Sequence, residues 1–390
     1  MAKKRREEEV DAPSFDSNII GALASDLNKE FKTSLGKIAY VGNEDSPSDI
    51  SDWVSTGCDM LDLAISNRPN GGLPVGRIVE LQGWSASGKS LLAAHICAET
   101  QKTGGIAVYI DTENAVSTDF FTAIGVDISK NWLYVPMSEL ENIFLTIEKI
   151  ISKIRGQNTG QIVTIIVDSI MGATTKVEAT SDYEKDGWAT SKAIVLSKAM
   201  RKITGLIANE KILLVLTNQL RSKLGVSFGD NSSTSGGHAV GFHSSVRLRL
   251  KSKGQIKIKK TGPDTISGIQ TEAKIIKNRL GPPHRAVDFD IYFDSGIDNY
   301  GSWLNTLKSY GIVKQAGAWY TLEAVNSDTG EVEEIKFQSK DFLTTLMDRE
   351  GLKDIIYKAI CDSYIMKYKA NSEFGIDDIE ITDTVEDEHE

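Results

Sequence analysis

The chain has 390 residues, of which 40% are hydrophobic and 25% charged, a balance typical of globular proteins. No apolar run approaches the roughly 20 residues of a membrane-spanning helix, and the basic start MAKKRREEEV is not followed by the apolar segment of a secretory signal. Three cysteines, odd in number and far apart, argue against a disulfide framework or a zinc site, so we expect a cytoplasmic protein.

The net charge of −10 argues against nucleic-acid binding, but its distribution reverses that conclusion. Residues 373–390 contain nine acidic side chains and no Lys or Arg, whereas residues 185–285 contain nineteen Lys and Arg against five Asp and Glu. The sequence therefore predicts a polyanion-binding surface and an acidic, disordered tail that competes for it. A merely solvated basic face is the alternative.

Residues 1–50 form an N-terminal arm. Asp16 or Ser17 caps a predicted helix whose apolar residues recur every three or four positions, at Ile20, Leu23, Leu27 and Phe31. A linker rich in Asp, Ser and Pro, residues 42–51, separates this helix from the rest of the chain. Such a helix packs either on its own chain or on a neighbouring subunit.

Residues 51–294 form a predicted core in which strand and helix patterns alternate. Nearly continuous apolar runs such as residues 162–167, in which Thr164 is the one polar residue, are typical of parallel strands buried on both faces. We expect a doubly wound, mostly parallel α/β sheet that binds ligands at the carboxyl ends of its strands. The expected strands are 78–81, 106–111, 162–167 and 212–216, and the expected helices are 91–101, 118–124, 138–154 and 192–209.

The pattern changes after residue 245. Residues 246–250 and 256–260 alternate at period two around Ser252–Gln255, which predicts a hairpin with a basic outer face. Further strands are expected at 272–278 and 287–293. Residues 295–372 mix helical and short strand signals and predict a small C-terminal α/β domain.

One stretch fills the phosphate-loop pattern G-x-x-x-x-G-K-[ST] between an apolar strand and a helix. Its glycines allow backbone N–H groups to face phosphate oxygens, Lys89 reaches the β and γ phosphates, and the Ser90 hydroxyl ligates Mg²⁺. A chance Gly/Ser loop is a poor alternative in that context. The sequence therefore predicts binding of a nucleoside triphosphate by Gly83, Trp84, Ser85, Ala86, Ser87, Gly88, Lys89 and Ser90.

Three further residues lie at the ends of predicted strands. Asp168 ends the run TIIVDS, where a carboxylate supports the metal. Glu113 follows the strand that ends at Asp111 and is a candidate to activate the attacking water, although a lone Glu there is otherwise a surface residue. Gln219 lies at the tip of another strand, where it would sense the γ-phosphate.

Two loops follow strands of the predicted sheet, at about 172–188 and about 220–242. The second is rich in Gly, Ser and Asn, with basic and apolar residues interspersed. Basic side chains hold a phosphate backbone, and apolar ones stack on or wedge between bases. We therefore expect two DNA-binding loops, with plain flexible loops as the alternative.

Ten runs in this order resemble the RecA-type homologous recombinases (the RecA/UvsX family), from about Ser55 to Tyr320. They are STGCDMLDLAI, GGLPVGRIVEL, the phosphate loop, YIDTENA, IIVDS, KAMRKITG, NQLRSKLGVSFG, GGHAVGFHSSVRLRL, KIIKNRL and AGAWY. The resemblance implies a DNA-dependent ATPase that uses ATP and Mg²⁺, polymerises as a helical filament on single-stranded DNA and promotes strand exchange with homologous duplex in DNA repair. It also implies that the helix near Ile20 is a polymerisation helix, and that single-strand-binding and mediator proteins are partners.

The resemblance also implies roles for single residues. Leu91 would complete the nucleotide loop, Phe120 would lie against adenine, Asp168 would hold Mg²⁺ through water, and Lys277 and Arg279 would reach ATP across a subunit interface. Glu113, Lys89 and Gln219 would be catalytic, and Leu224 would wedge between base triplets. DNA contacts are implied for Trp188, Arg201, Arg221, Lys223, Leu224, Phe228, Ser235, Gly236 and Gly237.

The chain departs from the family pattern at several positions. Gly241 replaces a usual Lys, Trp84 is bulky, and the turn at Asp328 is closer to T4-like phage recombinases, whereas the core is nearer the bacterial proteins. We expect a protein of a bacterial cell or a phage-infected host. A ring helicase of the same core fold and a non-hydrolysing recombination mediator are the alternatives, which the effect of single-stranded DNA on the ATPase rate would discriminate.

Overall fold

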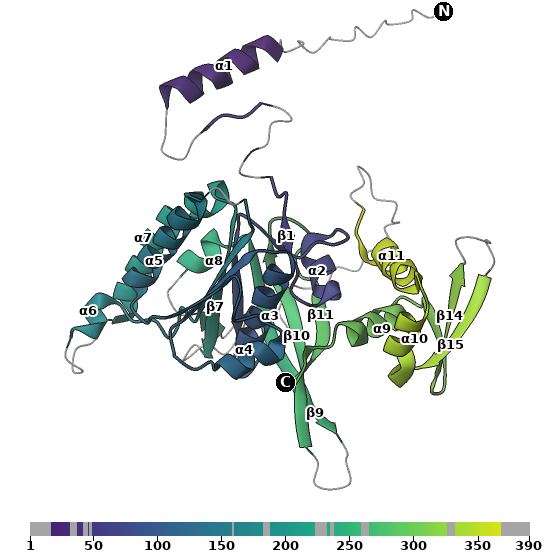
Figure 1. Ribbon diagram of the computed structural model, residues 1–390. Coiled ribbons are helices and arrows are strands. Elements are labelled where there is room, and N and C mark those ends of the chain that lie inside the picture. The colour runs from purple at the N-terminus through teal and green to yellow at the C-terminus, as the bar shows by residue number, and fades with distance from the viewer. Residues whose placement is uncertain are drawn as a thin grey trace, which may run out of the picture. The chain divides into compact units, whose positions relative to one another are not determined.

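The computed structural model describes residues 17–31, 37–41, 46, 49–157, 160–181, 188–222, 232–234, 238–258, 265–325 and 332–367 (Figure 1). Two compact units divide the chain, residues 1–49 and residues 50–390. Among the described residues, no helix combines the length and apolar character that crossing a membrane requires.

The first unit contains the predicted N-terminal helix, α1 (Ser17–Glu30). Asn28 ties the helix to the chain that follows it, because its side-chain oxygen accepts hydrogen bonds from the amides of Ile38 and Ala39 at 2.7 and 2.9 Å. The expected helix is confirmed. Its apolar residues Ile20 and Leu23 are exposed.

The second unit is built on a central sheet with ten strands among the described residues, in the order β12-β11-β10-β9-β3-β7-β6-β4-β5, with β8 paired to β7. The strands from β9 to β5 in this order run parallel, and the pairs β9–β10, β10–β11, β11–β12 and β7–β8 are antiparallel. Their bounds are β3 (Ile78–Gly83), β4 (Ile106–Asp111), β5 (Trp132–Pro136), β6 (Val163–Asp168), β7 (Ile212–Ser222), β8 (Ser232–Thr234), β9 (Val246–Ile258), β10 (Thr265–Asn278), β11 (Ala286–Tyr292) and β12 (Gly296–Ile297).

Helices cover both faces of this sheet (Figure 1). On one face lie α3 (Lys89–Lys102) and α4 (Thr118–Ile124), and on the other α5 (Leu140–Arg155) and α7 (Trp188–Asn209). Helix α5 buries Leu140, Ile143, Ile147 and Ile151, a spacing of three and four that places one apolar stripe against the sheet. Every residue of β3 and β6 is buried. The doubly wound, mostly parallel α/β fold is therefore confirmed.

The predicted hairpin around Ser252–Gln255 is wrong. Strand β9 runs through these residues and pairs with β10, with Ser252 opposite Thr271 and Gly254 opposite Gln270. The register between β9 and β10 shifts at this point, which is the mark of a β-bulge. The backbone of β9 therefore stays hydrogen-bonded to β10 through these residues, and the chain makes no turn here. Beyond the rest of the sheet β9 and β10 form a ribbon (Figure 1). The described Lys side chains of β9 in this ribbon, Lys251, Lys253 and Lys257, are exposed. Arg247 lies earlier in β9, within the central sheet, and is ion-paired with buried Glu80.

The second predicted DNA-binding loop also contains more regular structure than expected. Strand β7 continues to Ser222 and pairs antiparallel with β8, and α8 (Ala239–His243) follows. Strand β7 can extend past its neighbours β3 and β6 because β8 provides hydrogen-bond partners for the backbone of its last residues. In the first loop, α6 (Lys176–Ala179) begins with a capping box formed by Thr175 and Glu178.

The C-terminal region contains a three-stranded antiparallel sheet packed with helices. Its elements are α9 (Asn299–Ser309), β13 (Val313–Ala316), β14 (Trp319–Val325), β15 (Val332–Gln338), η1 (Ser339–Asp341), α10 (Phe342–Asp348) and α11 (Leu352–Tyr364). Trp303 of α9 is buried and stacks on Tyr357 of α11, with ring centroids 5.4 Å apart. These residues belong to the same hydrophobic cluster as buried residues of α3 and of α2 (Asp59–Ser66). The short strands β1 (Trp53–Val54) and β2 (Leu73–Pro74) form a separate antiparallel pair. The domain boundaries and the acidic tail at 373–390, which lies outside the described residues, stay predictions.

Candidate functional site

The phosphate loop connects β3 to α3, as predicted. Its conformation requires glycine at both fixed positions. A Cβ on Gly83 would lie 2.4 Å from Ser87 Oγ and 2.6 Å from the carbonyl oxygen of Leu250, and Gly88 has φ +91°. Lys89 is buried and folds back over the loop, donating to the carbonyls of Gly83 and Trp84 at 3.0 and 2.7 Å. Burial lowers the pKa of its ammonium, and the nearby carboxylates of Asp168 and Glu113 oppose that shift.

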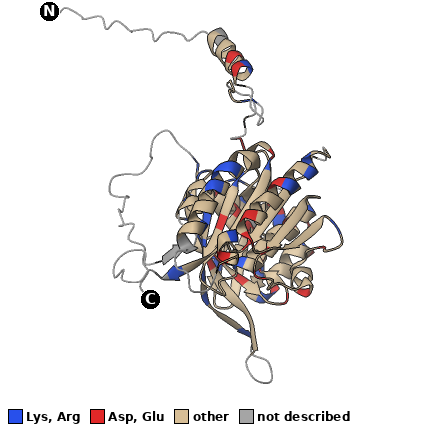
Figure 2. Ribbon diagram, turned by 90° about the vertical axis from the view of Figure 1, so that its left-hand side faces the viewer, with Lys and Arg blue, Asp and Glu red and all other residues tan. Residues whose placement is uncertain are grey.

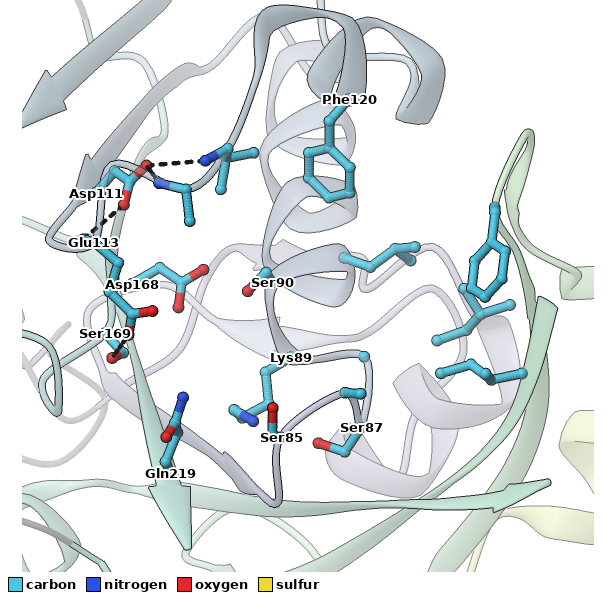
Figure 3. Close-up of a pocket in the computed structure, with 18 residues that line it drawn as sticks. Ser85, Ser87, Lys89, Ser90, Asp111, Glu113, Phe120, Asp168, Ser169 and Gln219 are labelled. Carbon is cyan, nitrogen blue, oxygen red and sulfur yellow. Dashed lines mark hydrogen bonds between the residues drawn. The ribbon is translucent and has the colours of Figure 1, made fainter. Parts of the chain in front are cut away.

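A cavity of about 450 Å³ opens over this loop at the carboxyl ends of the parallel strands (Figure 3). It brings together residues that are far apart in the sequence, from Ser85 to Phe293. The lining residues are Ser85, Ala86, Ser87, Gly88, Lys89, Ser90, Leu91, Asp111, Glu113, Ala115, Val116, Phe120, Asp168, Ser169, Gln219, Ile269, Ile291 and Phe293.

Asp168 lies at the end of β6 and faces this cavity. Both of its oxygens accept hydrogen bonds, from the Tyr109 hydroxyl at 2.5 Å and from the Thr217 hydroxyl at 2.5 Å. Burial, followed by the charge of Asp168, raises the pKa of Tyr109 well above its usual value, so the phenol remains a donor. The carboxylate is therefore held in one orientation on the same side of the cavity as Ser90 (Figure 3).

The loop that carries Glu113 is held by Asp111, whose role the sequence reasoning missed. Its two oxygens accept hydrogen bonds from four successive amides, those of residues 113–116, at 2.9–3.3 Å. Tyr134 donates to the same carboxylate at 2.9 Å. An Asp that ends a strand and precedes a short polar segment is a signal for such a turn.

Glu113 and Gln219 both line the cavity, as predicted. The Ser169 hydroxyl donates to Glu113 Oε1 at 2.9 Å, which fixes the carboxylate near the phosphate loop (Figure 3). Gln219 lies within β7 opposite Gly83 in the sheet register, so it is directly beside the start of the loop.

The apolar side of the cavity is made by residues from α4, β10 and β11. Phe120 is there as predicted. The sequence reasoning missed Ile269, Ile291 and Phe293, although Ile269 and Ile291 are register partners and Phe293 follows the end of β11. Phe293 is 55% exposed, which leaves part of this residue accessible to a ligand in the cavity.

Lys277 and Arg279 do not line this cavity. They lie at the end of β10 and just beyond it, where Lys277 Nζ donates to the carbonyls of Gly241 and Phe242 at 2.7 and 2.9 Å. Burial, followed by repulsion from Arg279 and Arg247, lowers the pKa of Lys277 to about 8. At Gly241, a Cβ would lie 2.8 Å from Cζ of Arg247, whose guanidinium is ion-paired with buried Glu80, so a side chain there would require that guanidinium to shift.

The predicted DNA contacts are only partly described. Arg201 on α7 and Arg221 on β7 are exposed, and Trp188 begins α7. Lys223, Leu224, Phe228, Ser235, Gly236 and Gly237 lie outside the described residues. Figure 2 shows Lys and Arg spread over several helices and strands of the face it presents, with Asp and Glu between them.

Residues 19–298 match the RecA N-terminal domain family. The chain belongs to the RecA family. It is 34% identical to Protein RecA of Brucella suis (strain ATCC 23445 / NCTC 10510) over 340 residues, which cover 85% of this chain and 89% of that protein. It is 33% identical to Protein RecA of Gluconacetobacter polyoxogenes over 315 residues, covering 80% and 85%. The chain is accordingly a homologous recombinase and DNA-dependent ATPase, as its sequence predicts.

Proposed function

We propose that this RecA-family protein binds ATP and Mg²⁺ in the cavity over the phosphate loop and polymerises on single-stranded DNA. The observation that carries the proposal is the convergence of Lys89, Glu113, Asp168 and Gln219 on one cavity beside a strand that continues to exposed Arg221. Hydrolysis and DNA contact are thereby linked through β7.

The donor set fits Mg²⁺. Ser90 and Asp168 supply a hydroxyl and a carboxylate, and no group of three His, Cys, Asp or Glu in the described part of the chain forms a separate metal cage. Mg²⁺ typically keeps several waters and is held by one or two protein groups plus substrate phosphates. Ser90 would ligate the ion, Asp168 would hold it through water, and the ion would neutralise charge on the phosphates.

The remaining roles follow from position. Lys89 exchanges its two backbone carbonyls for phosphate oxygens, and Glu113 orients and deprotonates the attacking water. Phe120 and Phe293 hold the base between them, while the backbone from Gly83 to Leu91 wraps the phosphates. Gln219 contacts the γ-phosphate and transmits its presence along β7 to the second DNA-binding loop.

The filament completes the site in this proposal. Lys277 and Arg279 lie away from the cavity of their own subunit, so they serve the ATP of a neighbour, and α1 docks its exposed apolar face on a neighbour. DNA is held by Trp188, Arg201, Arg221, Lys223, Leu224, Phe228, Ser235, Gly236 and Gly237. The protein pairs single-stranded DNA with homologous duplex in the cytoplasm of a bacterium or a phage-infected host, alongside single-strand-binding and mediator proteins.

The test is the ATPase rate of the purified protein with and without single-stranded DNA, together with electron microscopy of both samples. We expect DNA to raise the rate at least about tenfold, which corresponds to a barrier lowered by about 1.4 kcal/mol, and filaments to form with ATP and DNA. A rate indifferent to DNA, or an active protein that forms closed rings, would contradict the proposal.

A further inference from the structure

The first predicted DNA-binding loop begins directly against the water-activating carboxylate. Gly172, its first residue, has no room for a side chain, because a Cβ would lie 2.6 Å from both Glu113 Cγ and Thr112 Oγ1. Its amide donates to Ser169 Oγ at 3.1 Å, and the Ser169 hydroxyl donates to Glu113 Oε1 at 2.9 Å. One hydrogen-bond chain therefore joins the start of the loop to Glu113. Figure 3 shows its link between Ser169 and Glu113.

Lys192 ties the two ends of this loop together. It lies on α7, about one turn beyond Trp188, where the loop ends. Its ammonium donates to the carbonyl oxygens of Met171 and Ala173, at 2.8 and 2.5 Å, which are the carbonyls that flank Gly172. Hydrogen bonds from a charged donor are roughly twice as strong as neutral ones, so this contact fixes the backbone that presents the Gly172 amide.

Charged residues of both predicted DNA-binding loops act on Lys192. Glu178, in the first loop, favours its ammonium, whereas Arg221, at the start of the second, disfavours it, and burial is the largest influence lowering its pKa. A nucleic-acid backbone that neutralises Arg221 would remove this repulsion and strengthen the bonds to residues 171 and 173.

We propose that Lys192 is a positioning residue through which DNA bound at the two loops sets the orientation of Glu113. The inference rests on the proposed function and adds to it a second route, separate from Gln219. The order of contacts is Lys192, the backbone of residues 171–173, the Ser169 hydroxyl and Glu113. Each link is a hydrogen bond or a close contact between described atoms.

The first experiment compares Lys192→Met with Lys192→Arg and with Lys198→Met. Lys198 is exposed on the same helix and is the matched control. We expect Lys192→Met to lower the ATPase kcat at saturating single-stranded DNA about tenfold, with the half-saturating DNA concentration changed less than about twofold and DNA-free turnover changed much less than kcat. Arginine offers two donors to the two carbonyls and should restore most of the rate, and Lys198→Met should match wild type.

Two outcomes of this experiment overturn the inference. Equal losses with and without DNA would assign Lys192 a purely structural role, and a weakened DNA affinity with an unchanged saturated kcat would make it a simple DNA contact. If DNA does not change the ATPase rate of the wild-type protein, the proposed function and this inference are both overturned. If DNA stimulates the wild-type protein and Lys192→Met by the same factor, the inference alone is overturned.

A double-mutant cycle with Ser169→Ala tests whether Lys192 acts through the Ser169 hydroxyl. If it does, the Lys192→Met substitution should have at most a twofold further effect on DNA stimulation in the Ser169→Ala background, compared with about tenfold in wild type. Fully multiplicative effects of the two substitutions would overturn the proposed order of contacts. The unfolding temperatures of the four proteins should be compared, because the rates can be interpreted in this way only if all four proteins are folded.

Discussion

The two sides of the nucleotide cavity are built differently. The phosphate side lies at the ends of buried parallel strands, and its side chains are held by hydrogen bonds, as Asp168 is by Tyr109 and Thr217. The side proposed to hold the base, here called the base side, is apolar. It is formed by Phe120 of α4, Ile269 of β10, Ile291 of β11 and Phe293, which follows β11 and is 55% exposed. In the proposed function, the chemistry would therefore take place on side chains held by hydrogen bonds, whereas the base would be recognised by apolar side chains that are partly exposed.

This difference predicts different kinetic consequences for substitutions on the two sides. Loss of a group on the phosphate side should remove interactions made with the transferred phosphoryl group and lower kcat. Loss of an apolar group on the base side should weaken ATP binding equally in the ground and transition states and raise KM.

The largest effect is expected for Lys89→Ala. The buried ammonium is the main cation facing the phosphates from this subunit, and its loss should lower the ATPase kcat roughly 100- to 1,000-fold. Steady-state turnover with saturating DNA measures this, and Lys102→Ala, an exposed residue at the other end of α3, is the matched control. Wild-type turnover in Lys89→Ala would refute the site.

An intermediate effect is expected when pH is raised, on kcat/KM for ATP. The pKa of Lys277 is lowered to about 8, mainly by burial. The cation that would meet a neighbour's phosphates is thus present below pH 8 and lost as pH rises through this value, so kcat/KM for ATP should fall about tenfold per pH unit above it. In Lys277→Arg the decline should move to higher pH, because Arg stays charged. An alkaline limb that is the same in both proteins would show that Lys277 does not contact the triphosphate.

The smallest effect is expected for Phe293→Ala. Loss of a partly exposed aromatic face should cost roughly 1 kcal/mol, which corresponds to a rise in KM for ATP of about fivefold with little change in kcat. Phe242→Ala would not be a suitable control, since Phe242 lies beside Lys277; Leu343, exposed in α10, is suitable. A fall in kcat with an unchanged KM would contradict the division of the cavity into two sides.

The phosphate side could be predicted from the sequence because local rules govern it. The fixed positions of the phosphate loop carry their own backbone requirements, and Asp168, Glu113 and Gln219 follow apolar strands whose ends meet at one edge of a parallel sheet. Helix α4 begins and ends where its periodicity indicates. Asp111 was missed because its place at a strand end before a short polar segment indicates a turn, but does not show that its two oxygens accept four amides.

The base side and the β9–β10 ribbon could not be predicted in the same way, because they depend on register between distant segments. Ile269 faces Ile291 only once β10 and β11 are aligned, and no local pattern fixes that alignment. The Ser252–Gln255 stretch has turn composition, yet pairing with β10 overrides it and leaves a bulge. Tertiary hydrogen bonding decided both cases.

A mixing experiment tests most directly whether each ATP site is shared between subunits. Glu113→Gln removes the water-activating carboxylate, and the double substitution Lys277→Ala, Arg279→Ala removes the cations proposed to serve a neighbour, so each variant alone should be nearly inactive. In an equimolar mixture, random assembly places an intact carboxylate opposite intact cations at about a quarter of the junctions of a head-to-tail filament. We predict that the mixture recovers about a quarter of the wild-type DNA-stimulated ATPase rate. A mixture no more active than the average of the two variants would contradict the shared site.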